Sequence, residues 1–151
     1  MPLIAHGIDL VDIARIARLL AEHEGRFRAR CYTARELALA DDAGPARRAE
    51  FLAGRFAAKE AVLKALGTGL SGGVAWTDIE IDREPSGAPL LRLTGAAAAR
   101  AAELGIARWL ISISHTSTSD AALSSADPPR KAPENPVAGV AMASVIALSG
   151  A

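Results

Sequence analysis

The sequence predicts a single small α+β domain, residues 1–151, in which an antiparallel sheet packs against one long helix and several shorter helices. Three observations lead to this fold class. The chain has 151 residues, half of them apolar, which is enough for one modest core. Strand-like segments stand near both ends of the sequence and in a central hairpin. Between them, residues 47–66 form a long stretch of helical periodicity.

The N-terminal segment combines a strand with an amphipathic helix. Leu3 to Asp9 is a short apolar run that ends on an acid, which indicates an inner strand whose last residue emerges at an edge. From Ile13 onward, apolar residues recur at helical spacing while arginines share the opposite face. Asp12 is a suitable N-cap, and Gly25 is expected to end this helix.

Two more helices are expected before the middle of the chain. Thr33 and Glu36 have the Thr-x-x-Glu spacing of a capping box, so a short helix should begin at Thr33 and break within residues 41–45. Residues 47–66 place good helix formers between regularly spaced apolar side chains. Gly67-Thr68-Gly69 is then expected to end this long helix in a glycine-rich loop.

The second half of the chain is predicted to form a hairpin, a helix and a strand. Residues 79–82 and 91–94 alternate in strand fashion around 85–89, whose composition is that of a turn. The alanine-rich residues 95–104 predict a helix that stops at a glycine. Residues 109–114 then predict a strand that delivers a histidine at its end.

A polar segment interrupts the C-terminal part. Residues 119–136 contain several prolines and cannot bury a core of their own, so an insertion over the surface is expected. Residues 138–148 should form the final strand and pair with Trp109 to Ser114. If residues 141–151 were deleted, the core would be incomplete and folding should fail.

Composition limits the class of protein. Seventeen basic and seventeen acidic residues cancel, so neither nucleic acid nor a membrane is expected as the main partner. The single cysteine, Cys31, cannot form an internal disulfide, and the N-terminus lacks the basic lead-in of a signal peptide. The apolar residues 137–151 are too few to cross a bilayer. A cytoplasmic location is therefore expected.

The first candidate site combines Asp9, Glu60 and Lys64. Glu60 and Lys64 stand four residues apart on the long helix and so project from one face. Two carboxylates from separate elements, completed by substrate phosphates and water, would suit Mg²⁺. Glu60 and Lys64 could equally be an ordinary surface ion pair, and spacing alone does not decide between the two interpretations.

Two further groups could meet a phosphate. Arg55 and Lys59 lie on the long helix, Arg47 and Arg48 lie at its start, and the Gly67-Thr68-Gly69 loop at its end could bring backbone N–H groups close to an anion. His115, between hydroxyl residues, could orient a phosphate, take a proton or be structural. No P-loop glycine motif is present, and a Gly-Thr-Gly is more often only a helix stop.

Taken together, these segments resemble the holo-acyl-carrier-protein synthases, a family of phosphopantetheinyl transferases. Residues 50–69 resemble the family's Trp/Phe-x-x-Lys-Glu-Ala/Ser-x-x-Lys signature with its flanks. Gly7-Ile8-Asp9 resembles its N-terminal Gly-Ile-Asp, Ser86 to Pro89 its Gly-x-Pro hairpin, and Ser112 to Thr116 its Ser-x-Ser-His strand. The four motifs occur in the family's order over residues 3–116, and the resemblance implies the phosphopantetheinyl transferase fold.

The resemblance implies an activity and its residues. The 4'-phosphopantetheine group of coenzyme A would move to a serine of apo acyl carrier protein, leaving adenosine 3',5'-bisphosphate. Asp9 and Glu60 would hold Mg²⁺ against the coenzyme A pyrophosphate, and Lys64 would steady charge on the attacked phosphate. The residues implied to bind coenzyme A are Arg47, Arg55, Lys64, Gly67, Thr68, Gly69, Pro89, His115 and Thr116.

The resemblance also implies a homotrimer with sites between subunits and a first helix that meets the acidic carrier protein. The general base is either a metal-activated water or a carboxylate such as Glu60, and the carrier could belong to fatty-acid or polyketide synthesis. Ala88 departs from the family, which often has a basic residue there, so the hairpin's contact with coenzyme A should be weaker. A non-catalytic carrier-binding module and a purely structural trimer are the alternatives. The residues implied to bind the carrier are Arg15, Arg18, Leu19, Arg26, Phe27 and Arg28.

Overall fold

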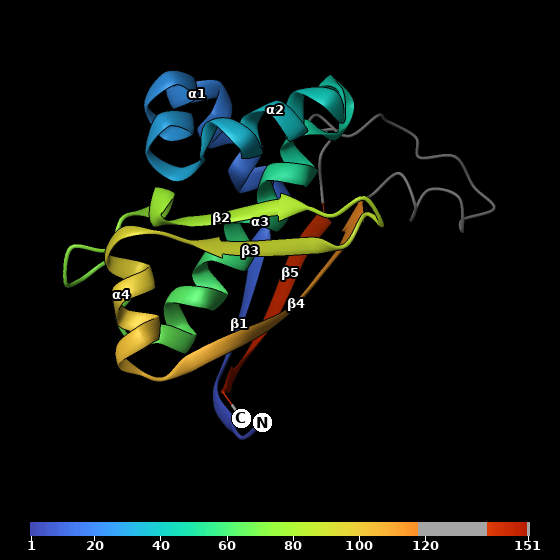
Figure 1. The fold of residues 1–151 in the computed structure, drawn as a ribbon. Coiled ribbons are helices and arrows are strands. Elements are labelled where there is room, and N and C mark those ends of the chain that lie inside the picture. Colours follow the sequence, from blue (N-terminus) through green and yellow to red (C-terminus); the bar gives the residue numbers. More distant parts are fainter. Residues whose placement is uncertain (118–138, 151) are drawn as a thin grey trace.

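The structure, a computed structural model, describes residues 1–117 and 139–150 and contains the α+β arrangement that the sequence predicts (Figure 1). The predicted insertion at 119–136 lies outside the described residues. In chain order the elements are β1 (Leu3–Asp12), α1 (Ile13–Cys31), α2 (Ala34–Asp42), α3 (Pro45–Leu66), the short 3-10 helix η1 (Trp76–Asp78), β2 (Ile79–Arg83), β3 (Pro89–Leu93), α4 (Gly95–Glu103), β4 (Ile106–Ser117) and β5 (Gly139–Ser149).

The main sheet has three antiparallel strands in the order β1-β5-β4, and β2 with β3 forms a separate hairpin. The final strand is therefore the central one. Its predicted pairing with residues 109–114 is confirmed, since Trp109 lies opposite Ala147 and Ser114 opposite Met142. Losing β5 would separate β1 from β4, which agrees with the expectation that the core needs these residues.

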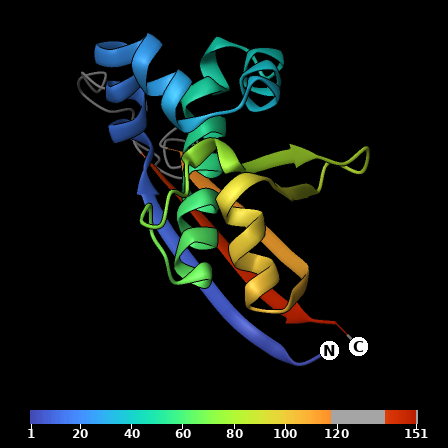
Figure 2. The same cartoon turned by 60° about the vertical axis from the view of Figure 1, so that its left-hand side comes forward.

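Helix α3 lies between two layers, with the sheet on one side and α1, α2 and the hairpin on the other (Figure 2). Every residue from Leu52 to Lys59 is consequently buried, whereas most helices bury only one face. Alternate residues of β5, among them Ala143 and Val145, face this helix and are fully buried. Small side chains on the central strand allow the helix and the sheet to approach closely.

The opposite face of the sheet carries exposed apolar side chains in the single chain. Ile8 and Leu10 on β1, Met142 on β5 and Leu110 on β4 expose between 37% and 63% of their surface. The register places Leu10 opposite Met142, and serines of β4 and β5 stand among these apolar residues. We call this surface the outer sheet face. Exposed apolar side chains gathered on one sheet face are compatible with an interface.

Helix α1 begins as predicted but does not end at Gly25. The Asp12 carboxylate accepts a hydrogen bond from the Ala14 N–H at 3.0 Å, which confirms the N-cap. The helix is kinked at His23 and then continues to Cys31. Phe27, on the continuation, packs edge to face with Tyr32, so a tertiary contact outweighs the poor helix propensity of the glycine.

Local signals placed the other helices correctly. Thr33 and Glu36 form the predicted capping box, and Gly67 ends α3 with a φ of 69°. The strands were predicted too short, because antiparallel pairing with β5 continues beyond the apolar runs, to Asp12 on β1 and past His115 on β4. Asp9 and His115 therefore lie within strands rather than at their ends. None of the described helices has the length and apolar character needed to span a bilayer.

Candidate functional site

Strand β1 crosses helix α3 in backbone contact at Gly7. A Cβ atom at this position would overlap the carbonyl oxygen of Ala61, so only glycine allows the strand and the helix to approach so closely. Asp9 stands two residues further on the same strand. The close approach brings its carboxylate to α3, where Lys64 Nζ donates hydrogen bonds to Asp9 Oδ1 at 2.8 Å and to the Ile8 carbonyl oxygen at 2.9 Å.

Glu60 completes this group, which we call the carboxylate cluster: Asp9, Glu60 and Lys64. Glu60 is half-buried, and its pKa is raised first by burial and next by the negative charge of Asp9. Lys64 and Arg15, the latter on α1, act in the opposite direction. The three predicted catalytic residues are thus close enough to interact electrostatically. Lys64 is bonded to Asp9, so the simple Glu60–Lys64 surface pair is not the arrangement adopted.

The carboxylate cluster suits a hard divalent cation that shares its ligands with a substrate. Among the described residues, no group of three or more His, Cys, Asp and Glu side chains gathers as a self-sufficient metal site. Two carboxylates with a raised pKa on one of them are nevertheless a region of unfavourable negative charge. Mg²⁺ is usually held by one or two carboxylates, with water and substrate phosphates as the other ligands. The donor set therefore fits Mg²⁺ bound together with a phosphate compound.

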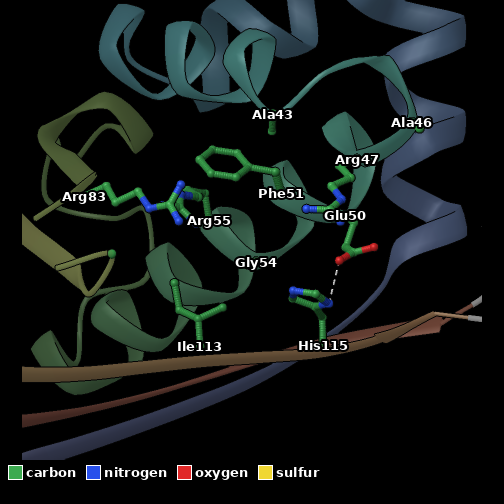
Figure 3. Close-up of a pocket in the computed structure, with 11 residues that line it drawn as sticks. Ala43, Ala46, Arg47, Glu50, Phe51, Gly54, Arg55, Arg83, Ile113 and His115 are labelled. Carbon is green, nitrogen blue, oxygen red and sulfur yellow. Dashed lines mark ion pairs between the residues drawn. The ribbon is translucent and has the colours of Figure 1, made fainter. Parts of the chain in front are cut away.

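A pocket of about 610 Å³ opens near the first half of α3 (Figure 3). Its walls come from the end of α2, from α3, from the β2–β3 hairpin and from β4. Three of its lining side chains are arginines, and Figure 3 shows Arg55 and Arg83 on one side of the cavity and Arg47 with a carboxylate and a histidine on the other. We call it the arginine pocket and define it by Arg47, Arg55, Arg83, Glu50 and His115.

Arg55 is the most unusual of these residues. The residue is only 9% exposed, its guanidinium lies 3.7 Å from the centre of the Phe51 ring, and its Nε atom has no hydrogen-bond partner among the described residues. Burial is the main cause that lowers the pKa of Arg55 to about 10. A buried donor without a partner is costly. A guanidinium that is buried without a paired carboxylate is a group that an anion in the pocket would stabilise.

His115 is held by Glu50 in the same pocket. His115 Nδ1 lies 2.6 Å from Glu50 Oε1, and Figure 3 shows the pair beside Arg47. A carboxylate at Nδ1 fixes the orientation of the imidazole. No role was predicted from the sequence for Glu50, Phe51 or Arg83. The four-residue spacing of Phe51 and Arg55 on a helix was the one local signal that could have related two of the pocket residues.

Other predicted coenzyme A ligands lie elsewhere in the single chain. Gly67 and Gly69 follow the far end of α3, about 18 Å along the helix axis from Arg55 at about 1.5 Å per residue. Thr68 lines a second hollow of about 350 Å³, beside Arg100. Pro89 pairs with Arg83 in the hairpin, and Thr116 lies opposite Val140 on the outer sheet face. One chain therefore presents the predicted residues as two separated groups.

The predicted carrier-binding residues divide between surface and core. Arg15, Arg18 and Arg26 are exposed on α1, and Arg28 interacts with Asp41 at 3.7 Å. Leu19 is half-buried. Phe27 is half-buried too, and its ring faces Tyr32 and Phe56 in the core. Arg15, Arg18 and Arg26 are thus exposed to an acidic partner, while Phe27 mainly holds the second part of the helix in place.

Lys59 is not a phosphate contact, which corrects the grouping of Lys59 with Arg55. Its side chain is fully buried, and Nζ lies 2.7 Å from Glu36 Oε2 and 3.0 Å from the Trp76 carbonyl oxygen. Glu36 Oε1 accepts the N–H of Ile81 on the hairpin. Burial raises the pKa of Glu36 and lowers that of Lys59, and the attraction between them opposes both effects. The pair joins α3, α2 and the hairpin.

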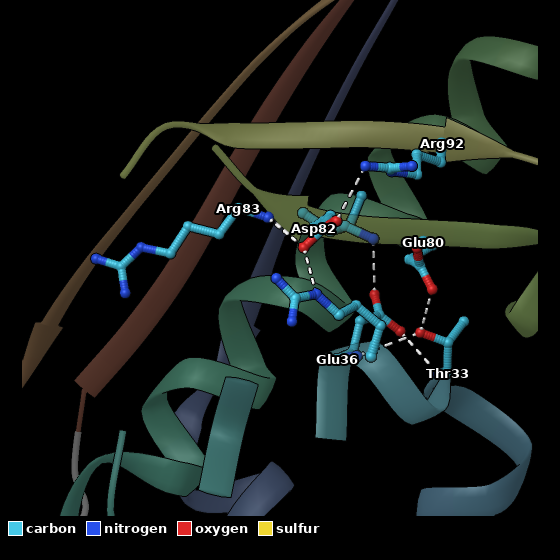
Figure 4. A network of polar contacts seen from close by, with 8 residues as sticks. Thr33, Glu36, Glu80, Asp82, Arg83 and Arg92 are labelled. Carbon is cyan, nitrogen blue, oxygen red and sulfur yellow. Dashed lines mark hydrogen bonds and ion pairs between the residues drawn. The ribbon is translucent and has the colours of Figure 1, made fainter. Parts of the chain in front are cut away.

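A second ion group holds the hairpin from outside (Figure 4). Asp82 accepts a hydrogen bond from Arg35 Nε of α2 at 2.8 Å and lies 3.2 Å from Arg92 of β3. The hydrogen bond from Arg35 is the main reason that the pKa of Asp82 is lowered. We call Glu36, Lys59, Asp82, Arg35 and Arg92 the hairpin anchor. It fixes the wall of the arginine pocket that carries Arg83.

Comparison with known proteins agrees with this arrangement. A model of the 4'-phosphopantetheinyl transferase superfamily matches residues 5–122. The holo-(acyl-carrier-protein) synthase of Methylobacterium radiotolerans is 58% identical over 98 residues, which cover 65% of this chain and 71% of that protein. The Koribacter versatilis protein of the same name is 46% identical over 110 residues, covering 73% of this chain and 86% of that protein.

Solved structures share the whole architecture. Acyl carrier protein synthase of Plasmodium yoelii with ADP bound matches with a TM-score of 0.76 at 27% identity, covering 99% of this chain and 98% of that one. Holo-(acyl-carrier-protein) synthase of Helicobacter pylori in complex with coenzyme A matches with a TM-score of 0.71 at 29% identity, covering 95% of this chain and 99% of that one.

Proposed function

The chain belongs to the 4'-phosphopantetheinyl transferase superfamily, and we propose that it is a holo-acyl-carrier-protein synthase that uses coenzyme A to modify a serine of apo acyl carrier protein. The observation that carries this proposal is the meeting of Asp9, Glu60 and Lys64 where β1 touches α3. Two carboxylates and an ammonium at one point suit a pyrophosphate substrate held with a divalent cation. A non-catalytic carrier-binding module would not require that combination.

The reaction exchanges one phosphorus–oxygen bond for another. The carrier serine oxygen bonds to the phosphorus that bears pantetheine, the bond from that phosphorus to the bridging oxygen breaks, and adenosine 3',5'-bisphosphate leaves. The serine proton passes to a base or to water. Asp9 and Glu60 would hold Mg²⁺, which when bound neutralises charge on the pyrophosphate. Lys64 stabilises the negative charge that develops on the attacked phosphate.

The arginine pocket supplies the second half of substrate binding. Its three guanidinium groups and the Glu50-bound His115 face a cavity large enough for part of a nucleotide. Because the pyrophosphate is assigned to the carboxylate cluster, the phosphate left for the arginines is the phosphate monoester on the coenzyme A ribose. Guanidinium groups bind such dianions through paired charge-assisted hydrogen bonds.

We further propose that the complete site forms between copies of the chain in a homotrimer. The outer sheet face offers exposed Ile8, Leu10, Leu110 and Met142 for burial between subunits. The Gly67–Gly69 loop of one chain and the arginine pocket of another could then approach one bound coenzyme A. This would explain why one chain keeps the two groups of predicted ligands apart.

Subunit complementation tests the shared site. We expect Glu60→Gln and Arg55→Met proteins each to have little activity, and to regain part of it when refolded together, because a mixed trimer would contain some sites with both residues intact. Complementation in a protein that sediments as a trimer supports the proposal. A monomer, or a trimer without complementation, contradicts the shared site and leaves the transfer activity itself untouched.

The acidic carrier protein is proposed to bind beside α1. Arg15, Arg18 and Arg26 are exposed on this helix, and Arg15 is close enough to the carboxylate cluster to influence the pKa of Glu60. A carrier bound to these residues would present its serine near the attacked phosphate. Electrostatic attraction of this kind raises the association rate and weakens with salt.

The direct test of function is transfer to a carrier. The protein is incubated with coenzyme A, Mg²⁺ and several apo carriers, and each carrier is weighed by mass spectrometry. We expect the added mass of one phosphopantetheine with at least one carrier, its loss in Glu60→Gln, and its retention in the surface control Glu103→Gln. An unmodified set of carriers that nevertheless bind would favour a binding module. Failure of coenzyme A with Mg²⁺ to raise the melting temperature would favour a structural trimer.

A further inference from the structure

The β2–β3 hairpin lacks the cation expected at its tip. Ala88 stands between Gly87 and Pro89, where the resembling family often has a basic residue, and its own side chain carries no charge. The turn is otherwise well formed, since the Glu84 N–H donates to the Ala88 carbonyl oxygen at 2.8 Å and the Gly87 N–H donates to the Glu84 carbonyl oxygen. The backbone of the turn is therefore present without the charge.

Arg83 brings a charge to the same place from another position. It is the last residue of β2 and lies directly opposite Pro89 in the hairpin register. Its guanidinium folds beneath the turn, with Nη2 3.6 Å and Nε 3.8 Å from the point where a Cβ of Gly87 would lie. Figure 3 shows the side chain entering the arginine pocket beside Arg55.

Arg83 is not part of the hairpin anchor. Asp82, its neighbour in sequence, is occupied by Arg35 and Arg92, and Figure 4 shows the Arg83 side chain extending away from that group. Only the backbone N–H of Arg83 bonds to Asp82. Within the described part of the chain, the Arg83 guanidinium has no ion-pair partner. Its charge is therefore free for a ligand.

Arg83 and Arg55 lie close enough to repel each other, because the charge of Arg83 contributes to the lowered pKa of Arg55. Among the described residues that line the pocket, the one carboxylate is that of Glu50, and it is already engaged by His115. An anion that entered the cavity would offset the repulsion between these two adjacent cations. A phosphate monoester with two negative charges would offset both.

We infer that Arg83 replaces the missing hairpin cation and binds the ribose phosphate of coenzyme A, so that this chain selects coenzyme A over dephospho-coenzyme A through a residue of β2. This inference rests on the proposed function. It extends that function by identifying a specificity-determining residue outside the recognised motifs.

The test compares two substrates that differ only in that phosphate. KM is measured for coenzyme A and for dephospho-coenzyme A with the full-length protein, Mg²⁺ and one carrier. Arg83→Gln should raise KM for coenzyme A about tenfold, since a charge-assisted hydrogen bond is lost, and leave KM for dephospho-coenzyme A within about twofold. Arg92→Gln is the matched control, because it removes an arginine from the same hairpin while Arg35 still holds Asp82. It should change neither KM.

A second variant relocates the charge. Arg83→Gln combined with Ala88→Arg should restore most of the preference for coenzyme A, because the cation returns from the turn itself. Equal effects of Arg83→Gln on both substrates, or no effect on either, would overturn the inference. Failure of the wild-type protein to transfer phosphopantetheine would instead reject the proposed function, and calorimetric binding of the two nucleotides would still decide the role of Arg83.

Discussion

The hairpin anchor and the arginine pocket both involve the β2–β3 hairpin, but their charged side chains differ in how far they are paired with opposite charges. In the anchor, Glu36 meets Lys59, and Asp82 meets Arg35 and Arg92. In the pocket, arginines face a cavity in which Glu50, the only carboxylate from the described part of the chain, is engaged by His115. In the anchor, each charged side chain is paired with an opposite charge. In the pocket, Arg55 and Arg83 have no ion-pair partner among the described residues, so an anion could still bind there.

The difference separates charges that stabilise the fold from charges that serve binding. Arg35 and Arg83 are the same residue type and both lie near Asp82, but only Arg35 uses its side chain to bond that carboxylate. Substitutions in the anchor should therefore alter stability, and substitutions in the pocket should alter ligand affinity. Variants of Lys59, Arg55 and Asp82 can test whether the charges that stabilise the fold are distinct from those that bind a ligand.

The largest effect is expected in the anchor, at Lys59. Lys59→Met would leave the Glu36 carboxylate buried without its counter-charge, and we expect the free energy of unfolding to fall by about 3–5 kcal/mol. Urea unfolding measures this change.

The loss of stability in Lys59→Met should also depend on pH. Without the lysine, the pKa of Glu36 in the folded state is raised further above its unfolded value. A raised folded pKa stabilises the fold below the unfolded pKa and loses that contribution as pH rises. The loss should therefore be smaller at pH 5 than at pH 8, and a loss independent of pH would contradict the assignment.

The second prediction concerns the pocket, at Arg55. Arg55→Met removes a buried charge and an unpartnered Nε while keeping most of the apolar contact with Phe51. We expect coenzyme A affinity to fall at least tenfold, about 1.4 kcal/mol. The free energy of unfolding without ligand should stay within about 1 kcal/mol or rise. Calorimetry and urea unfolding measure the two quantities. A protein that lost stability but kept its affinity would place Arg55 with the anchor instead.

The smallest effect is expected at Asp82. Asp82→Asn weakens the hydrogen bond to Arg35, and we expect a loss of about 1 kcal/mol at neutral pH. The pKa of Asp82 is lowered in the folded state, so its contribution is fully present above the unfolded pKa and is lost as pH falls through the folded value. The difference between variant and wild type should be constant from pH 8 to pH 5 and shrink below about pH 4. A difference that grew with acid would reverse the sign and contradict the ion-pair interpretation.

The sequence predicted those elements whose signals are local. The Thr33 capping box and the Gly67 helix end depend on residues within one turn, and both are confirmed. Gly25 was wrongly expected to end α1, because the contact of Phe27 with Tyr32 is made by the tertiary fold. The extra length of β1 and β4 depends on pairing with β5, which no single segment reveals.

The candidate site also combines residues that the sequence indicates with residues that only the tertiary fold brings together. Asp9, Glu60 and Lys64 were singled out by spacing and by family motifs, and their meeting depends on a strand and a helix far apart in sequence. Glu50 stands in the flank of the family signature and Arg83 lies outside the motifs, and neither had a predicted role. Only the pocket in the folded chain relates them to Arg55. Lys59 has the residue type of a phosphate ligand, and burial beside Glu36 excludes that role.

The contact at Gly7 has a consequence for how this protein can change over time. Where β1 meets α3, main chain touches main chain, and no side chain lies in the gap. The distance between Asp9 on the strand and Glu60 on the helix should therefore depend little on the size of the surrounding hydrophobic residues. Lineages could exchange many core residues without altering that geometry, while a single added methyl group at position 7 would disrupt it.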